Sequence, residues 1–299
     1  MRLSLLTLFT VPLMAAAADK PTSPVADGAK PVKVSDAFKF TEGPAPDADG
    51  NVYFTDQPND RIHVWSAADG KISTFLEPCG RSNGLCFDKD GVLWACADEK
   101  NELWKIDVKT KKHTVVAKGF AGKPLNGPND IWVRPDGGAY FTDPFYKRDY
   151  WAKDRKEEQD KKAVYFVGKD GKPVRVDDDF GAPNGIIGTP DGKTLYVADI
   201  NKRKTYQYAI QDDGKLINRK LFCELGSDGM TLDEAGNVYL TGQGVTVFDK
   251  TGAKVVNIAI PEPWTANVCF GGKDMKTLFV TASKSVYTVQ MTVKGAARQ

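Results

Sequence analysis

Short runs of apolar residues, separated by polar turns that contain glycine, recur along most of the chain. The clearest form is a pair of such runs, as in EGPAPDADGNVYFTD from Glu42 and PNDIWVRPDGGAYFTD from Pro128. The second run is rich in β-branched and aromatic residues, which favour strands, and the glycine supplies the positive φ angle of a tight turn. The pattern therefore predicts a β-hairpin as the repeating unit.

Six segments of the chain follow this pattern, and the other four begin at Ser82, Pro183, Ser227 and Ala266. One acidic or amide residue opens each unit, and these six markers are Glu42, Asn83, Asn129, Asn184, Asp228 and Asn267. Successive markers are 41, 46, 55, 44 and 39 residues apart. A period in the forties that is built from short strands is typical of a β-propeller blade.

Two further strand-like runs follow each hairpin, so that a complete unit has four strands. Third runs such as RIHVWS precede fourth runs such as KISTFL, but the sixth unit ends after its third run, SVYTVQ. Residues 31–36 resemble the missing fourth strand. We therefore expect an all-β fold, a six-bladed β-propeller with four-stranded blades that an N-terminal strand closes, with residues 31–299 as its single domain.

The beginning of the chain departs from this pattern. Residues 1–18 have a basic start, an apolar run and then small residues. This layout is typical of a secretory signal peptide with cleavage near Ala17 or Ala18, and the apolar run is too short to span a bilayer. Residues 19–30 are expected to form a flexible lead-in. The prediction is a secreted or periplasmic protein that has no membrane attachment after cleavage.

The composition limits the choice of partners. The chain has 299 residues, of which 41% are hydrophobic and 27% charged, as in a soluble globular protein. Its net charge of +2 gives no reason to expect nucleic acid as a partner. We expect a monomer that acts on a small molecule.

The five cysteines follow no spacing that is typical of a metal site. Cys86 and Cys96 flank one predicted hairpin. A disulfide between them is one possibility in an oxidising compartment, and buried thiols are the other. The charged insertion at residues 147–162 is expected to be a surface loop or lid rather than a core helix.

The six markers are candidates for a functional site. In a propeller, each outer strand connects across one face to the innermost strand of the next blade, so the markers should surround the mouth of the central tunnel. Asn and Asp are also common in turns because they bond to their own backbone, and this explanation stays open for any single marker. Glutamate has no such preference, and yet Glu42 opens the first unit.

Carboxylates that face each other in a dry tunnel repel unless a cation lies between them. The oxygen ligands of the markers fit calcium best, because calcium accepts irregular geometry and six to eight oxygens. Magnesium demands stricter octahedral geometry, and zinc prefers nitrogen or sulfur ligands. One divalent cation, Ca²⁺, is expected, with Mn²⁺, Zn²⁺ and Mg²⁺ as alternatives.

Histidine is nearly absent from the sequence, which narrows the chemistry. His63 and His113 fall on predicted third and fourth strands, away from the markers. No Ser-His-Asp arrangement can be built from these residues. A hydrolase of this sequence would depend on the metal as a Lewis acid and on a carboxylate beside it.

Four motifs resemble the SMP-30/gluconolactonase/LRE family, and bacterial gluconolactonases are the nearest members. The motifs are TEGPAPDADGNVYFTD, LNGPNDIWVRPDGGAYFTDPFY, APNGIIGTPDGKTLYVAD and SDGMTLDEAGNVYLTG. The resemblance implies a six-bladed propeller with one divalent metal in the tunnel, usually calcium. It also implies hydrolysis of lactones such as sugar lactones, and some relatives act on phosphotriesters.

The resemblance also implies roles for individual residues. Glu42 and Asn184 match metal ligands, and Asp228 matches the aspartate that binds the metal and serves as catalytic acid and base. Asn129 matches the asparagine that holds the substrate and, in some relatives, the metal. The expected metal ligands are thus Glu42, Asn129, Asn184 and Asp228. Tyr146 is expected to contact the substrate.

Some residues have a less definite role. Tyr146, Trp151 and Trp264 are candidate walls of a substrate pocket, although packing between blades would explain each of them equally well. Asn83 and Asn267 are kept as residues of the tunnel rim or as supports of the metal ligands.

The expected activity is hydrolysis of a sugar lactone by a gluconolactonase-like enzyme that uses the metal in its tunnel. Two alternatives remain open. One is a phosphotriester or other ester hydrolase with the same metal site. The other is a propeller that only binds a partner, with calcium bracing its tunnel.

Overall fold

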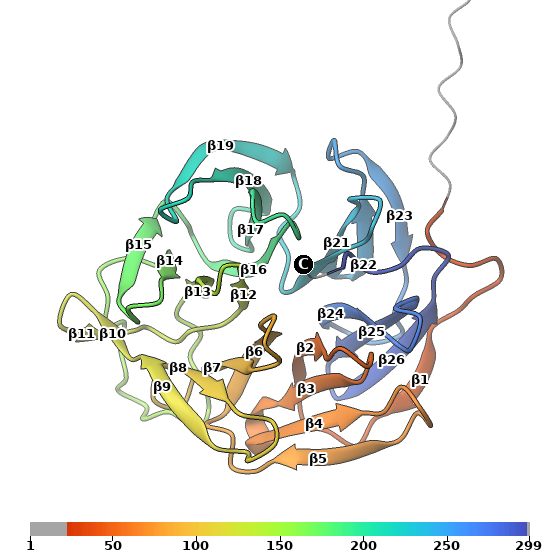
Figure 1. Ribbon diagram of the computed structural model, residues 1–299, viewed down its shortest axis with the longest axis horizontal. Coiled ribbons are helices and arrows are strands. Elements are labelled where there is room, and N and C mark those ends of the chain that lie inside the picture. The colour runs from red at the N-terminus through yellow and green to blue at the C-terminus, as the bar shows by residue number, and fades with distance from the viewer. Residues whose placement is uncertain (1–22, 298–299) are drawn as a thin grey trace, which may run out of the picture.

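Six four-stranded antiparallel sheets stand around a common centre (Figure 1). The computed structural model describes residues 23–297, so the predicted signal peptide lies outside the described residues. Each sheet is one blade. Its innermost strand is the first in sequence, except in the last blade, where the strand from the N-terminus lies outermost. The predicted all-β propeller with six blades is therefore confirmed. No helix in the described part of the chain is long and apolar enough to cross a membrane.

The blades follow one another along the chain, and their strands fall where the repeat predicted them. Blade 1 contains β2 (Thr41–Pro46), β3 (Val52–Asp56), β4 (Arg61–Trp65) and β5 (Ile72–Leu76). Blade 2 contains β6 (Ser82–Phe87), β7 (Leu93–Ala97), β8 (Glu102–Ile106) and β9 (His113–Ala117). Blade 3 contains β12 (Ile131–Val133), β13 (Ala139–Asp143), β14 (Ala163–Val167) and β15 (Pro173–Asp177).

The second half of the ring is built in the same way. Blade 4 contains β16 (Pro183–Gly188), β17 (Thr194–Asp199), β18 (Lys204–Ile210) and β19 (Leu216–Cys223). Blade 5 contains β20 (Met230–Leu232), β21 (Val238–Gly242), β22 (Gly244–Phe248) and β23 (Lys254–Ile258). Blade 6 contains β24 (Thr265–Gly271), β25 (Thr277–Ala282), β26 (Ser285–Gln290) and β1 (Val32–Ser35). Among the described residues, three short elements lie outside the blades: η1 (Gln57–Asn59), β10 (Gly119–Phe120) and β11 (Lys123–Pro124).

The two ends of the chain meet in the last blade. Strand β1 pairs antiparallel with β26, where Val32 lies opposite Thr288 and Lys33 opposite Tyr287. Figure 1 shows this pairing as a red-orange strand beside blue ones. The strand satisfies the outer edge of β26 and closes the ring, as the missing fourth run predicted. The described part of the lead-in continues along the same blade, where Val25 forms a β-bridge with Met291.

The apolar core lies between the blades. Within the described residues, six clusters of buried apolar side chains each join two neighbouring blades. At the closure, Phe54 of blade 1 packs against Phe279 of blade 6 with ring centroids 5.5 Å apart. Burial of apolar area is worth about 25 cal/mol per Å². Because this area is buried between blades, each blade is stabilised by its contacts with its two neighbours. The ring therefore holds the inner strands in fixed relative positions.

The structure also shows where the cysteines, the two histidines and the charged insertion lie. Cys86 pairs in register with Trp94 rather than with Cys96, and all five cysteines are buried thiols rather than disulfides. His63 lies on β4 and His113 begins β9, both as predicted. The insertion is a loop: residues 144–162, all of which the structure describes, contain turns and bends but no helix or strand.

Candidate functional site

The six markers lie at the same end of the six innermost strands, which we call the tunnel mouth. Glu42, Asn83, Asn184 and Asn267 lie at the beginning of β2, β6, β16 and β24, and Asn129 and Asp228 each lie two residues before β12 and β20. All six side chains are buried. The connection from the outer strand of one blade to the inner strand of the next places them there.

Glycines that follow the markers allow the inner strands to come unusually close. A Cβ atom on Gly43 would lie 2.1 Å from the carbonyl oxygen of Asn83 on the next blade. A Cβ atom on Gly185 would lie 2.9 Å from the carbonyl oxygen of Asp228. Real Cβ atoms do not approach backbone so closely, so these positions require glycine. The glycines thus bring the markers of neighbouring blades together.

Asp228 is held by two donors from other blades. The Nδ2 of Asn184 donates a hydrogen bond to Oδ1 at 2.8 Å, and the indole Nε1 of Trp264 donates to Oδ2 at 2.6 Å. The same amide of Asn184 donates to the hydroxyl of Tyr146 at 3.1 Å. The structure therefore brings three predicted site residues, Asn184, Asp228 and Tyr146, into one hydrogen-bonded group. Trp264 contacts this group directly.

Glu42 and Asp228 form an electrostatically strained pair. Burial, followed by the negative charge of Asp228, raises the pKa of Glu42 well above its ordinary value. Burial also raises the pKa of Asp228 to about 6, although the hydrogen bonds from Trp264 and Asn184 act in the opposite direction. The Glu42 carboxylate accepts a hydrogen bond at 3.1 Å from the backbone N–H of Gly43. A cation between the two carboxylates would relieve this repulsion.

The donor atoms at the tunnel mouth fit a hard divalent cation. Oδ1 of Asn184 is buried, and it has no hydrogen-bond partner among the described residues; the same is true of Oδ1 of Asn83. Unpaired buried oxygens are costly unless something binds them. No group of three or more His, Cys, Asp or Glu residues in the described chain could hold a metal ion, so amide oxygens would have to complete the ligand set. Carboxylate and amide oxygens together suit calcium.

Asn129 and Asn267 differ in how far their side chains are engaged. The backbone of Asn129 is fixed on both sides, because its N–H donates to Thr142 at 2.9 Å and its carbonyl accepts from Gly84 at 2.7 Å. No hydrogen bond joins the Asn129 side chain to another described residue, which leaves its amide available for a ligand. The Asn267 Oδ1 already accepts the N–H of Val268 at 2.8 Å.

Asp130 is a buried carboxyl that the repeat pattern did not predict. Its two oxygens accept backbone N–H groups of Ile131 at 3.0 Å and Ile186 at 3.3 Å. Burial raises the pKa of this carboxyl to about 7, against the effect of those hydrogen bonds. Its position directly after a marker, where most units have glycine, could have revealed it. It lines a cavity of about 100 Å³ further along the inner strands, together with Asn267 and Ala296 near the C-terminus.

The loop at residues 144–162 contributes aromatic and cationic groups. Arg148 donates through Nε to Asp98 at 2.9 Å, and its guanidinium lies 5.6 Å from the ring centroid of Tyr146. Trp151, a predicted pocket wall, packs instead within the loop, where the guanidinium of Arg155 stacks 3.3 Å from its ring centroid. Arg148 was not predicted, because the repeat gives no position for a residue of an insertion. Asp98 was not predicted either, although it directly follows the second strand of its unit.

A second cavity lies beside the candidate catalytic residue. It has a volume of about 200 Å³ and is lined by residues of blades 4 and 5, including Asp228, Thr241 and Gln243. Trp264 forms part of the wall of this cavity. The cavity would admit part of a small molecule next to the Asp228 carboxylate.

Comparisons with known proteins identify the family and the fold. A family model described as the SMP-30/gluconolactonase/LRE-like region matches residues 40–284. A gluconolactonase of Zymomonas mobilis is 27% identical over 296 residues, which covers 89% of this chain and 83% of that protein. A pentonolactonase of Haloferax volcanii is 31% identical over 268 residues, covering 84% of both chains. The structure of a gluconolactonase from Xanthomonas campestris has a TM-score of 0.83 at 27% identity, over 90% of this chain and 91% of that one.

Proposed function

Because the chain belongs to the SMP-30/gluconolactonase/LRE-like family, we propose that it hydrolyses a sugar lactone with the help of one divalent cation, calcium, at the tunnel mouth. The observation that carries this proposal is the buried Asp228 carboxylate, which Asn184 and Trp264 hold in place. A buried carboxylate in a fixed orientation beside a second one is a suitable base next to a cation. The lactonase names of the relatives support the substrate class.

Glu42, Asn184 and Asp228 would hold the cation, with Asn129 as a fourth ligand or as a substrate contact. When bound, the cation would supply a Lewis acid for the lactone carbonyl. Glu42 and Asp228 would offer two negative charges to balance its two positive ones, and the Asn184 Oδ1 would gain a partner. Mn²⁺, Zn²⁺ and Mg²⁺ remain alternatives, which metal analysis of the purified protein would distinguish.

The protein residues would carry the proton transfer. Asp228 would accept a proton from the water that attacks the lactone carbonyl carbon. The ester bond between that carbon and the ring oxygen would then break, and Asp228 would return the proton to the departing ring oxygen. The product would be the open hydroxy acid. Asn184 and Trp264 would keep the carboxylate in place throughout.

Asn129 and Tyr146 would orient the substrate. The Asn129 amide would donate to or accept from the lactone, because its side chain has no hydrogen bond to another described residue. The Tyr146 hydroxyl accepts a 3.1 Å hydrogen bond from Asn184, and it would limit the room for substrate beside that residue. Precise placement of a substrate against a base can account for a large part of the rate of an enzyme.

A paired assay tests the proposed function. Purified mature protein would be given glucono-1,5-lactone and an aryl phosphotriester, each with calcium and with the chelator EGTA. We expect hydrolysis of the lactone that EGTA abolishes and that added calcium restores. Activity on the phosphotriester alone would favour the alternative hydrolase. Absence of both activities in protein that contains calcium would favour a binding module.

We also propose that the protein is exported and acts as a monomer. The basic and apolar composition of residues 1–18 supports export. N-terminal sequencing of protein recovered from the periplasm or the medium should show cleavage near Ala17 or Ala18. Light scattering on the mature protein should give the mass of one chain. Retention in the cytoplasm with residue 1 intact would contradict the first proposal.

A further inference from the structure

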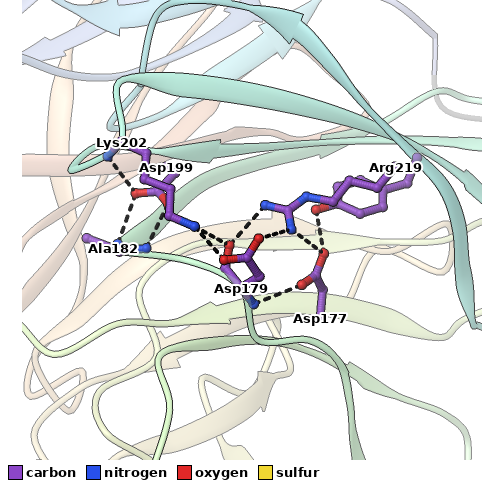
Figure 2. A network of polar contacts seen from close by, with 8 residues as sticks. Asp177, Asp179, Ala182, Asp199, Lys202 and Arg219 are labelled. Atoms are coloured by element: carbon purple, nitrogen blue, oxygen red, sulfur yellow. Dashed lines mark hydrogen bonds and ion pairs between the residues drawn. The ribbon is translucent and has the colours of Figure 1, made fainter.

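Aspartates at the end of the second strand form a structural clamp in three blades. Each carboxylate accepts hydrogen bonds from the two backbone N–H groups that lie three and two residues before the marker of its own blade. At 2.7 to 3.2 Å, the three clamps are Asp56 with Lys39 and Phe40, Asp143 with Asn126 and Gly127, and Asp199 with Gly181 and Ala182. Figure 2 shows the Asp199 clamp. The clamp fixes the turn that leads into the tunnel.

Asp98 has the same position in blade 2 but does not form the clamp. The N–H of Arg81, two residues before marker Asn83, donates instead to Asp60 at 2.7 Å. The N–H of Cys79 also donates to Asp60, at 3.0 Å. Asp98 is only 1% exposed, and a buried carboxylate needs other partners in place of water. Asp60 thus replaces Asp98 as the acceptor for the turn before Asn83, and the Asp98 carboxylate can bind other groups.

Asp98 binds the loop above the tunnel mouth instead. Its Oδ2 accepts hydrogen bonds from Arg148 Nε at 2.9 Å, from the Tyr150 hydroxyl at 2.9 Å and from Gln57 Nε2 at 3.1 Å. Arg148 and Tyr150 both belong to the loop at residues 144–162. The guanidinium of Arg81 lies 4.4 Å from the centroid of the Tyr150 ring and supports it from another side. Asp98 therefore fixes the loop where it approaches the site.

Arg148 still has donors to offer. Of the Arg148 donors, only Nε donates a hydrogen bond to Asp98, and the two Nη groups of Arg148 make no hydrogen bond to any described residue. The guanidinium lies against the Tyr146 ring, and the Tyr146 hydroxyl accepts a hydrogen bond from Asn184. The Arg148 charge also acts on Glu42 and Asp228, whose pKa values burial raises and Arg148 lowers. The unused Nη donors therefore belong to a group that contacts Tyr146, and the Asn184 amide joins Tyr146 to Asp228.

We propose that Arg148 is a substrate-contacting residue whose Nη groups donate hydrogen bonds to the ring hydroxyl oxygens of the sugar lactone. Asp98 is its positioning residue. The Asp98–Arg148 pair has no net charge, so it suits a neutral ring with several hydroxyl groups better than an anionic substrate. This inference rests on the proposed function and adds that the enzyme selects polyhydroxylated lactones over unsubstituted ones.

The test compares two lactones that differ in hydroxyl groups, glucono-1,5-lactone and δ-valerolactone, under saturating calcium. In Arg148→Met, KM for glucono-1,5-lactone should rise about tenfold or more, because hydroxyl binding is lost in ground state and transition state alike. The loss of the Arg148 charge, which acts on Asp228, affects both lactones. The kcat/KM for δ-valerolactone should therefore also fall, but at least about threefold less than kcat/KM for glucono-1,5-lactone. Arg148→Lys should recover part of the loss, since lysine keeps the charge but not the fork of donors.

Two aspartate variants provide matched controls. Asp98→Asn should raise KM for glucono-1,5-lactone about threefold, because the amide holds Arg148 less firmly. Asp199→Asn removes the carboxylate at the same position of blade 4, where it clamps backbone only. It should lower the melting temperature and leave the ratio of kcat/KM between the two lactones unchanged. If Arg148→Met affects both lactones equally, or if Asp199→Asn changes the ratio as Asp98→Asn does, the inference is wrong.

A binding measurement separates this inference from the proposed function. If the wild type hydrolyses neither lactone, the proposed function fails, and calorimetric titration with 1,5-anhydroglucitol, a neutral ring with the hydroxyl groups of the lactone, decides about Arg148. Binding that is about tenfold weaker in Arg148→Met would support the contact with hydroxyl groups. Equal affinities of the two proteins, or no binding by the wild type, would overturn it.

Discussion

The Asn184 side chain donates a 2.8 Å hydrogen bond to Asp228, and this bond joins the innermost strands of two neighbouring blades. Asn184 lies on β16, and Asp228 lies two residues before β20. Trp264, just before β24, donates to the other oxygen of Asp228. The orientation of the carboxylate is thus set by three blades whose relative positions the core fixes. Such placement on rigid elements is what a catalytic base requires.

Replacing the proposed base should remove most of the activity. In Asp228→Asn, kcat for glucono-1,5-lactone should fall by about 10²- to 10⁴-fold, because an amide cannot take a proton from water. The measurement is a pH-stat assay at saturating calcium, with calcium affinity determined separately by calorimetry. Trp264→Phe, which keeps the carboxylate but removes one hydrogen bond, should lose only about tenfold. Wild-type activity in Asp228→Asn would contradict the mechanism.

Removing the charge of Glu42 should have opposite effects on stability with and without calcium. In EGTA at pH 8, Glu42→Gln should melt at a higher temperature than the wild type, because a buried carboxylate that repels Asp228 is gone. In millimolar calcium the order should reverse, since ion binding stabilises only the folded wild type. A difference of about 1–3 kcal/mol in each direction is expected. Differential scanning fluorimetry would measure both.

The matched control for this experiment is Glu77→Gln. Glu77 forms a surface ion pair with Arg61 at 3.0 Å and has a side chain that is 48% exposed. An exposed pair contributes little to stability. Its removal should therefore change the free energy of unfolding by no more than about 0.5 kcal/mol, with or without calcium. A calcium response in Glu42→Gln as large as that of the wild type would show that the ion binds elsewhere.

Most of the fold could be predicted from the sequence because the repeat is local. Each hairpin carries its own turn glycine and its own β-branched run, so the strands are visible without knowledge of the rest of the chain. The closure by β1 was also predictable, because a sixth unit that lacks a fourth strand needs one from elsewhere. The loop at residues 144–162 has no repeat to define it, and its contacts with Asp98 depend on the assembled blades.

The candidate site was predictable only where the repeat assigned a residue to a fixed position within its blade. The six markers were placed at one end of the inner strands, as expected, because their spacing fixed their position in each blade. Asp130 stands where most units have glycine, which is a visible departure from the repeat, but the sequence does not show that its carboxyl group is buried. Arg148 could not be found, because its role depends on Asp98, which lies 50 residues away in sequence.

The glycines beside the markers should tolerate no side chain. In Gly84→Ala, the new Cβ would lie 2.7 Å from the carbonyl oxygen of Asn129 and 2.6 Å from Oδ1 of Asp130. Overpacking of this kind should lower the free energy of unfolding by about 1–3 kcal/mol. The control is Gly168→Ala, where the nearest atom lies 3.6 Å away, and its effect should stay within about 0.5 kcal/mol. Urea unfolding would measure both, and equal effects would disprove the argument.

The Asp143 clamp should make stability depend on pH. Burial raises the pKa of Asp143 to about 7, although the N–H groups of Asn126 and Gly127 act in the opposite direction. In the unfolded chain this carboxyl titrates near its ordinary value of about 3.9. Between these two values the folded state keeps a proton that the unfolded chain has released. The free energy of unfolding should therefore fall as the pH rises through this window and level off above it.

The comparison of wild type with Asp143→Asn isolates this contribution, because the amide cannot titrate. Between pH 5 and pH 7 the wild type should lose more stability than the variant, by on the order of 2–3 kcal/mol. Urea unfolding in EGTA keeps metal binding out of the measurement. The two curves should run parallel above pH 8, where the wild-type carboxyl is ionised in both states. Parallel curves across the lower window as well would mean that Asp143 is already ionised in the folded protein at pH 5, and that its two backbone hydrogen bonds outweigh its burial.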